Sequence, residues 1–497
     1  MICCAIGLQS WATLRVAGFD LGIFDQAIRA YSHFDLPRSS IKSVHHEFPP
    51  SFTLLGDHFT PVLALLAPLY WLWDDPRVLI FAQSALFAFG VLPARRIARR
   101  CFSDTSRDGG EVAVNVSGLV YALGWPLLNS AYSGFHEVAF ATPIILMMLE
   151  RGMASRYRSA AAWALLLCAV KEDMGLVVGL FGVLLAVRSH RVREKRGRTV
   201  GLVLAVTGPL MAALTIGWFL PHMGSPKGYY WSYGRLGADA GEAIANTLTA
   251  PWILFEVAFT PSIKVVMLAW ILGTLALLPI GSATFLLAVP LLAERMLSDN
   301  PNHWVVINHY DAFLWPILFV ASLETLERLR KFGAGWEKSS RRAAIAAVAL
   351  GSAASVFLGL SLLVNPSHWR ASPDKQALIE AVNLIPDGVT VEADNAIAPR
   401  LTKRTKVVIA DETPRGSEWV LLRAKDRTFP FGNTEDQKQR IALLLDHGYV
   451  EMWEKDGATL LHRVKNVPIP GSGMPGADSV PVREKVPEDV GRSAFLR

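Results

Sequence analysis

The chain has 497 residues, of which 52% are hydrophobic and only 19% are charged, with a mean hydropathy of +0.31. These values exclude an ordinary soluble protein, and several continuous apolar runs approach the ~18–20 residues that a helix needs to cross a bilayer. The net charge of +6 does not indicate nucleic-acid binding, because the basic residues cluster beside apolar segments as they do in cytoplasmic loops. The sequence therefore predicts an all-α polytopic membrane protein.

The amino-terminal segment is only weakly apolar. Met1–Ala17 is short for a bilayer crossing and carries Gln9, Ser10 and Arg15. We expect this helix either to enter the membrane partly or to be shortened by a misplaced start. The four cysteines (Cys3, Cys4, Cys101 and Cys168) lack the spacing of a disulfide framework or zinc site, so we expect isolated thiols.

A long polar loop, residues 18–61, follows this first segment. It contains an unusual number of ionisable residues: Asp20, Asp25, Asp35, Asp57, Glu47, His33, His45, His46 and His58. A connector between apolar segments does not need so many acid and base groups. We therefore expect the chemistry of the protein to lie in this loop.

The following apolar segments alternate with loops of opposite character. The predicted segments are 62–73 (interfacial or re-entrant), 78–93, 112–128, 138–149, 160–170, 174–187, 200–220, 263–279, 282–297, 312–323 and 343–364. The alternation places every arginine-rich loop, above all 188–198, on one side and every cluster of acids and histidines on the other. The positive-inside rule makes the arginine-rich side cytoplasmic. We expect about ten to eleven spans, with the 18–61 loop outside the cell.

The composition changes at residue 365. Predicted short strands (389–393, 407–410, 419–423 and 458–463) and helices (375–384 and 434–447) are separated by glycine and proline. Residues 1–364 thus form a transmembrane domain, residues 365–465 a small extracytoplasmic α/β domain, and residues 466–497 a disordered tail.

Five clusters of ionisable residues fall on the predicted outer side: 19–26, 56–61, 135–140, 171–175 and 308–311. Such groups are expensive at a membrane and by default indicate a functional site, so we expect one shared polar cavity. The candidate catalytic residues are Asp20, Asp57 and His58. The candidate substrate-binding residues are Asp25, Gln26, His136, Glu137, Lys171, Glu172, Asp173, His309 and Tyr310.

Each cluster also has a structural interpretation. The alternatives are a helix cap for Asp20, a turn and cap for Asp57 and His58, an interfacial pair for His136 and Glu137, a charge-compensated hairpin tip for residues 171–173, and a packed histidine for His309. On a helix, Asp20 and Asp25 point about 140° apart, so they would not line one site together. Asp20, nearer the membrane edge, is the preferred catalytic residue.

Cofactor motifs are weak. Carboxylates with histidines suit Mg²⁺ or Mn²⁺, but no ligand spacing specifies a metal, and none is assigned. The sequence contains no Walker loop, no GxGxxG after a strand and no GxSxG elbow, which argues against ATP-driven transport by this chain alone. The aromatic tract 229–233 favours a membrane-interface belt over a sugar platform.

Several blocks resemble a bacterial membrane family called domain of unknown function 2079. They are GFDLGIFDQAIRAY, LLGDHFTPVLALLAPLYWL, FHEVAFATP, VKEDMGL and HYDAFLWPILF, which occur in the family's order between residues 17 and 329. The segment IPDGVTVEADNAIAPRLTKR resembles the family's usual carboxy-terminal extension. The first helix departs from the family, in which a full span precedes the FDLGIFDQ block.

That family is similar in layout to the C-type glycosyltransferases, integral membrane enzymes that use polyprenyl-phosphate sugars. The resemblance implies a protein of the bacterial plasma membrane, with membrane lipid, a polyprenyl-phosphate-linked sugar donor and an envelope glycan, lipid or protein acceptor as its partners. By position, it makes Asp20 the general base, and Lys171 or His58 the group that steadies the leaving lipid phosphate. The alternatives are a transporter or flippase with the acids as a proton relay, or a non-catalytic envelope protein.

Overall fold

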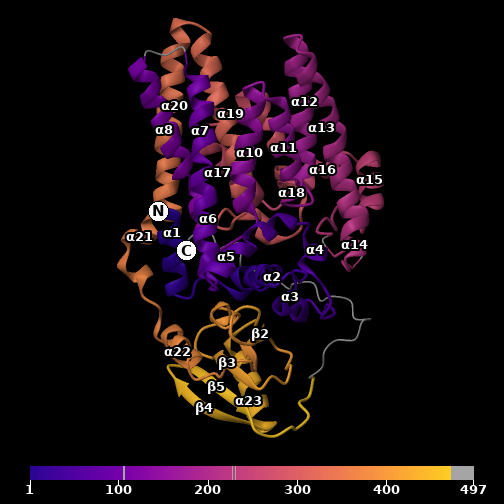
Figure 1. The fold of residues 1–497 in the computed structure, drawn as a ribbon, viewed down its shortest axis with the longest axis vertical. Coiled ribbons are helices and arrows are strands. Elements are labelled where there is room, and N and C mark those ends of the chain that lie inside the picture. The colour runs from indigo at the N-terminus through magenta and orange to yellow at the C-terminus, as the bar shows by residue number, and fades with distance from the viewer. Residues whose placement is uncertain (104–106, 227, 230, 472–497) are drawn as a thin grey trace.

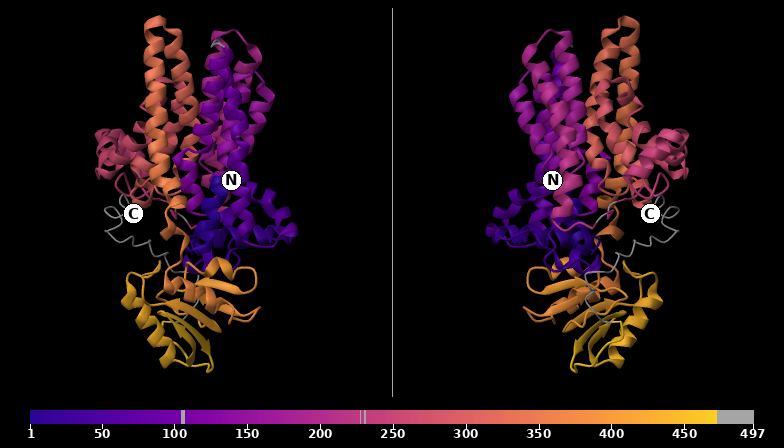
Figure 2. Two further views of the ribbon diagram at one scale, coloured as in Figure 1. Left: turned by 90° about the vertical axis from the view of Figure 1, so that its left-hand side faces the viewer. Right: turned by 90° about the vertical axis from the view of Figure 1, so that its right-hand side faces the viewer.

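The computed structural model describes residues 1–103, 107–226, 228–229 and 231–471. A bundle of helices forms most of the molecule, and a small sheet domain lies at one end of it (Figures 1 and 2). We call this end of the bundle the domain end and the opposite one the far end. Most of the predicted disordered tail, and Tyr230 of the aromatic tract, lie outside the described residues.

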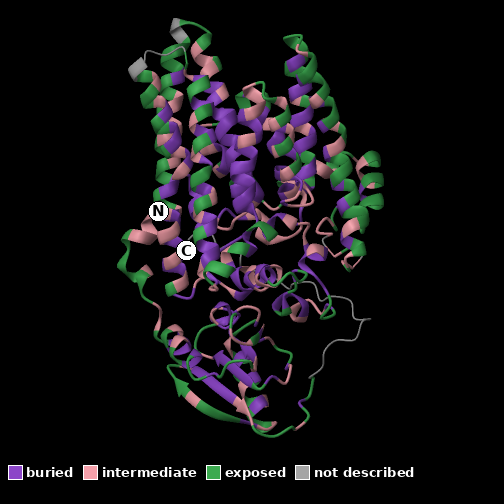
Figure 3. Cartoon of the chain, viewed as in Figure 1, coloured by how far each residue is buried: buried purple, intermediate pink, exposed green. Residues whose placement is uncertain are grey.

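The helices of the bundle are α1 (Ile2–Ala12), α6 (Arg77–Phe89), α7 (Val91–Cys101), α8 (Arg107–Ala122), α9 (Trp125–Tyr132), α10 (Val138–Met153), α11 (Tyr157–Leu167), α12 (Met174–Arg191), α13 (Lys195–Leu214), α14 (Leu220–His222), α15 (Ala240–Thr249), α16 (Trp252–Phe259), α17 (Ile263–Gly273), α18 (Val289–Leu297), α19 (Asp311–Lys331), α20 (Ala334–Ser355) and α21 (Ser361–Val364). The most buried helices, α10 and α19, lie at the centre (Figure 3). Helices α15 and α16 were not predicted, because the sequence reads there as a long loop.

In the part of the chain that the structure describes, five helical stretches are long and apolar enough to cross a membrane: Arg77–Cys101, Gly109–Tyr132, Met174–Arg191, Lys195–His222 and Trp336–Val364. The pair α16 and α17, bent by 80°, would make a sixth crossing if it acts as one broken span. The predicted all-helical membrane architecture is confirmed. The count of ten to eleven spans stays a prediction, since several predicted segments, such as α1 and α11, form shorter helices.

The helix that contains the predicted apolar segment 78–93 is longer than that segment. Helices α6 and α7 make one continuous stretch that includes the basic residues after Pro93 and ends at Cys101. Gly90 keeps helical dihedral angles at the junction, and Pro93 lies in the first turn of α7, where proline is tolerated. A side chain at residue 90 would collide with the Tyr121 hydroxyl, which lies 2.1 Å from the position of a Cβ atom.

Small residues bring α12 and α13 into close contact. A Cβ atom on Gly182 would lie 2.3 Å from the Ala205 backbone nitrogen, and one on Gly208 would lie 2.4 Å from the Gly175 carbonyl oxygen. Backbones can approach this closely only where side chains are absent, as in other membrane helix pairs. The two helices therefore form a tightly packed hairpin.

Charge is segregated along the bundle. The basic last turns of α7, α12 and α19 lie at the far end (Figure 1). The predicted acid and histidine clusters lie at the domain end. By the positive-inside rule, the far end is predicted to face the cytoplasm.

The polar loop of residues 18–61 is largely ordered into short helices. They are a π-helical turn (Gly18–Gly22), α2 (Ile23–Ser32), α3 (Ser40–His45) and α4 (Leu54–Asp57), followed by a 3₁₀ turn (Pro61–Leu66) and α5 (Ala67–Leu72). The last two match the predicted interfacial segment, with Trp71 and Trp73 exposed. The loop lies at the domain end of the bundle.

The sheet domain contains α22 (Pro373–Val382), β1 (Thr390–Ala393), β2 (Lys406–Ile409), β3 (Trp419–Arg423), α23 (Thr434–Asp446), β4 (Tyr449–Lys455) and β5 (Ala458–Arg463). The strand order is β2-β1-β3-β5-β4, with β1 parallel to β2 and β3, and β5 antiparallel to its neighbours. Only β4, an edge strand whose residues are mostly exposed, was missed. The predicted α/β character is confirmed.

The sheet domain packs on the polar loop. Ile23 and Ile41 of the loop share one buried apolar cluster with Ile397 and Ile409 of the domain. The Gly18 N–H donates to the Asn395 carbonyl over 2.8 Å. The domain and the loop therefore support each other.

Candidate functional site

The first part of the site joins Asp20 to His136. Asp20 lies in the π-helical turn before α2, and His136 lies just before α10. His136 Nε2 lies 3.2 Å from Asp20 Oδ1. The His136 side chain is 6% exposed and that of Asp20 is 40% exposed. A buried imidazole thus holds a carboxylate that remains open to solvent.

Burial alone would lower the pKa of His136, but the neighbouring carboxylates, Asp20 first, leave it raised. His136 is therefore the charged partner. Its ring stacks on His309 with the centroids 3.5 Å apart. Burial, and then the charge of His136, lower the pKa of His309 well below its ordinary value, so this ring is neutral. The stack fixes the orientation of His136.

His309 is held by its own neighbours. Its ring lies 4.4 Å from that of Tyr310, which lies 5.2 Å from that of His303. The next residue, Asp311, begins α19 and forms a buried ion pair with Arg295 of α18. The start of α19 is thereby tied to α18.

The second part of the site is the ion pair of His58 and Glu172. His58 Nδ1 lies 2.8 Å from Glu172 Oε1, and the Phe59 N–H donates to Glu172 Oε2 over 3.1 Å. Burial would lower the pKa of His58, but the Glu172 and Asp57 carboxylates raise it to about 9. Burial would raise the pKa of Glu172, but His58 and Lys171 lower it to about 2. Both groups are charged at neutral pH.

Lys171 lies between two further carboxylates, at 3.7 Å from Asp173 Oδ2 and 3.8 Å from Glu294 Oε1. Burial first, and then the charge of Glu294, raise the pKa of Asp173 well above its ordinary value. Both carboxylates approach the Lys171 ammonium, so Glu294 lies close enough for its charge to disfavour ionisation of Asp173. Burial would lower the pKa of Lys171, but the surrounding acids raise it, which keeps the ammonium charged.

These contacts belong to one site. The charges of His136, Lys171, His58 and His303 all lower the pKa of His309. Glu137, which is buried, raises the pKa values of His136 and Lys171. Residues from all five predicted clusters therefore converge at the domain end. We call this group of residues the polar cluster: Asp20, His58, His136, Glu137, Lys171, Glu172, Asp173, Glu294, His303, His309 and Tyr310.

Asp57 lies at the edge of the polar cluster. Its carboxylate pairs with Lys42 of α3 at 2.8 Å, and the Lys42 ammonium also lies 5.5 Å from the centre of the Tyr229 ring. Asp57 thus ties α3 to α4, and its charge reaches the polar cluster through the raised pKa of His58.

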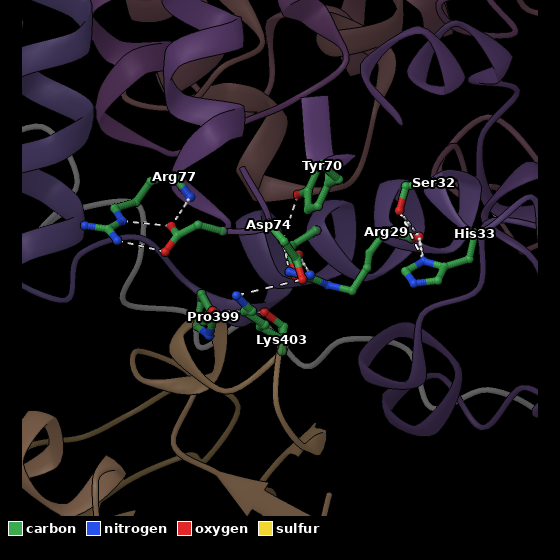
Figure 4. Close-up of polar contacts among 11 residues, drawn as sticks. Arg29, Ser32, His33, Tyr70, Asp74, Arg77, Pro399 and Lys403 are labelled. Atoms are coloured by element: carbon green, nitrogen blue, oxygen red, sulfur yellow. Dashed lines mark hydrogen bonds and ion pairs between the residues drawn. The ribbon is translucent and has the colours of Figure 1, made fainter. Parts of the chain in front are cut away.

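Asp25 and Gln26 lie apart from the polar cluster. Asp25 is fully buried, and accepts hydrogen bonds from Tyr70 over 2.7 Å and from Arg29 over 3.0 Å. Arg29 also pairs with Asp74, which Lys403 of the sheet domain approaches to 3.9 Å (Figure 4). This network fastens α2 to α5 and to the sheet domain.

Gln26 performs a similar joining role. Its amide nitrogen donates to the Val407 carbonyl over 3.2 Å, and its amide oxygen accepts from Ser39 over 2.7 Å. The structure thus separates Asp20 from Asp25 as the helix geometry predicted. It also shows the Asp20 carboxylate bonded to His136 rather than capping a helix.

Sequence reasoning missed Glu294 and His303. Glu294 lies in α18, inside a segment that was interpreted only as an apolar span, although a charged residue there is itself a signal. His303 lies in a short 3₁₀ turn, Pro301–Trp304, of a polar loop with no distinguishing pattern.

Within the described ranges, no group of three or more histidine, cysteine or acidic residues is arranged to hold a metal ion. Most of the possible metal ligands of the polar cluster are paired with each other or with Lys171: Asp20 with His136, His58 with Glu172, and Asp173 and Glu294 with Lys171. They do not fit a Mg²⁺ or Mn²⁺ centre, so no step is assigned to a metal. The four cysteines are free thiols.

The fold and the site define a polytopic membrane protein with a polar cluster at one end of its helices. The chain belongs to the family described as "Predicted membrane protein (DUF2079)", whose model matches residues 10–460. The resemblance found in the sequence blocks is confirmed.

Among solved structures, the chain is similar to ArnT from Cupriavidus metallidurans in its apo state. The TM-score is 0.48 at 11% sequence identity, over 92% of this chain and 96% of ArnT. No curated protein matches the chain by sequence.

Proposed function

We propose that this protein is a membrane glycosyltransferase that transfers a sugar from a polyprenyl-phosphate donor to an acceptor at the domain end, the predicted outer face. The observation that carries the proposal is the pairing of a half-exposed carboxylate, Asp20, with a buried charged imidazole, His136. The resemblance in layout to polyprenyl-phosphate-dependent enzymes supplies the substrate class.

The proposed reaction is a single displacement with inversion. Asp20 accepts the proton of an acceptor hydroxyl, the oxygen forms a bond to the anomeric carbon, and the bond from that carbon to the phosphate oxygen breaks. The electron pair leaves with the polyprenyl phosphate. His136 orients the Asp20 carboxylate through their 3.2 Å contact, and the stacked His309 holds His136 in place.

The leaving phosphate needs a cation nearby, because negative charge develops on it as the bond breaks. His58 and Lys171 are the charged candidates of the polar cluster, each held by carboxylates. In this proposal the charges of His58 and Lys171 stabilise the negative charge that develops on the phosphate. Glu172 and Asp173 hold these two cations in position.

The second candidate is a proton-coupled transporter or flippase for a lipid-linked or small polar solute. It is favoured by the raised pKa of Asp173 and by the placement of Asp173 and Glu294 around one lysine, since closely spaced acids in membrane proteins often form proton relays. A non-catalytic envelope protein is the remaining alternative.

The test uses the purified full chain in liposomes with polyprenyl-phosphate sugars and candidate glycan, lipid or peptide acceptors. The proposal predicts a glycosylated product, detected by mass spectrometry, without a pH gradient. The transporter alternative predicts uptake that depends on a pH gradient and no such product. Absence of both would leave the non-catalytic alternative.

A further inference from the structure

Two cavities lie where the sheet domain meets the first turns of the chain. The larger has a volume of about 600 Å³ and is bordered by the 366–375 connector. The smaller has a volume of about 360 Å³ and is bordered by the 395–396 and 427–429 loops of the sheet domain. Arg15 and Lys375 line both cavities, so the two are adjacent. We call them together the junction cavity.

The walls of the junction cavity are strongly basic. Arg15, Arg370, Lys375, Arg423 and Arg427 line it, and no acidic residue does. Only Arg423 is neutralised, through ion pairs at 3.0 Å and 2.9 Å with two buried aspartates of the sheet domain. Among the described residues, the other four basic side chains form no ion pair.

The hydrogen bonds of these four basic side chains are not made to charged groups. Arg15 donates to the His368 carbonyl over 2.7 Å, and Arg427 donates to the Phe431 carbonyl over 2.7 Å. A carbonyl carries no net charge, so neither contact compensates a guanidinium. Burial, and then the charges of Arg423 and Arg15, lower the pKa of Lys375, while the Asp374 and Asp394 carboxylates act in the opposite direction. The five basic side chains and the two aspartates bound to Arg423 carry a formal net charge of 5 − 2 = +3, and such like charges around one space repel each other unless an anion joins them.

The amino end of helix α22 adds positive electrostatic potential to the junction cavity. Ser372, the residue before its first turn, lines the cavity, so the amino end of the helix is directed to the same place. Asp374 in that first turn is bonded to Arg423, and its charge also reaches Lys375, so it offsets part of the positive charge of the cavity. Guanidinium and ammonium groups at a helix start are the usual donors for phosphate oxygens.

We propose that the junction cavity binds a phosphoryl group or diphosphate, carried either by a soluble phosphorylated molecule or by a lipid headgroup. The cavity adjoins the polar cluster. Asn395 lines it, and the Asn395 side-chain oxygen accepts a hydrogen bond of 3.2 Å from the N–H of Phe19, the residue before Asp20. The anion site is a property of the charges and does not depend on the proposed transfer chemistry.

The test measures binding by the full chain. Inorganic pyrophosphate is titrated by calorimetry into detergent-purified protein, and phosphatidic acid is offered in nanodiscs against a neutral-lipid control. The variants are Lys375→Gln with Arg370→Gln, Arg370→Gln alone, and Lys425→Gln. Lys425 is an exposed lysine of the same domain that does not line the cavity, so it controls for total charge.

The double variant is expected to bind about tenfold more weakly or worse, because it removes two charge-assisted contacts, and Lys425→Gln to bind like the wild type. Saturable pyrophosphate binding with this pattern supports a soluble ligand. The pattern with phosphatidic acid alone supports a lipid headgroup. No binding, or binding that the Lys425 control weakens equally, overturns the proposal. If the double variant does not fold, the exposed Arg370→Gln variant is read alone, with a smaller loss expected.

Discussion

The ion pair of His58 and Glu172 gives a prediction with a definite pH window. In the folded protein the pKa of His58 is about 9, against an ordinary value of 6.5, a difference that corresponds to about 3 kcal/mol. The side chains are 31% and 11% exposed, so solvent screening reduces this contribution. We expect the pair to stabilise the fold by about 1–3 kcal/mol.

The sign of the pH dependence follows from the direction of the shift. Because the pKa of His58 is raised on folding, its stabilisation is complete below pH 6.5 and disappears as the pH rises through about 9. The pKa of Glu172 is lowered from 4.5 to about 2, so the same interaction is lost in acid across that interval. The stabilising window therefore lies between these two edges.

The assay is a double-mutant cycle on denaturant or thermal unfolding in detergent. Glu172→Gln, His58→Gln and the double variant are compared with the wild type at pH 6.5 and pH 10, with exposed His33→Gln as control. The coupling energy is expected to be about 1–3 kcal/mol at pH 6.5 and close to zero at pH 10. A coupling that is absent at pH 6.5, or equal at both pH values, would refute the charged pair.

Three further predictions concern packing and orientation. Asp25→Asn removes the buried one of the two carboxylates that pair with Arg29 and should lower the free energy of unfolding by about 1–3 kcal/mol, while an unchanged value would mean that the buried pair is dispensable. Gly182→Val places a side chain against the α13 backbone and should lower the free energy of unfolding by about 1–3 kcal/mol. Gly217→Val is the control and should cost little, because the space around its Cβ position is open. Equal costs for the two variants would contradict the tight hairpin. A membrane-impermeant maleimide should label Asp35→Cys in intact cells and Arg193→Cys only after lysis, and the reverse pattern would invert the predicted orientation.

The sequence predicted most helices and strands because their signals are local. Apolar runs define the spans, and the strand 419–423 and helix 434–447 of the sheet domain were placed within a residue of their ends. Edge strand β4 was missed because its side chains are mostly exposed and lack a buried face. In the 18–61 loop a helix after Asp20 was considered, but α3 and α4 were missed because their apolar residues Ile41 and Leu54 pack in a cluster that the distant sheet domain completes.

The site was predictable to the extent that charge is expensive near a membrane. That principle selected Asp20, His136 and Glu172 from separate parts of the chain, and the structure brings them into one polar cluster. The same principle could not show that the carboxylate of Asp25, an equally acidic neighbour, is bonded to Arg29 and Tyr70, because both contacts depend on packing.

The most direct measurement of the central proposal is the turnover of sugar transfer by the Asp20→Asn variant. Asparagine keeps the shape of the side chain but cannot accept the proton of an acceptor hydroxyl. The turnover number is expected to fall by about 10²–10⁴-fold while unfolding is unchanged, whereas Asp35→Asn, at an exposed aspartate of the same loop, should retain full activity. Wild-type turnover in Asp20→Asn would contradict the assignment of Asp20 as the general base.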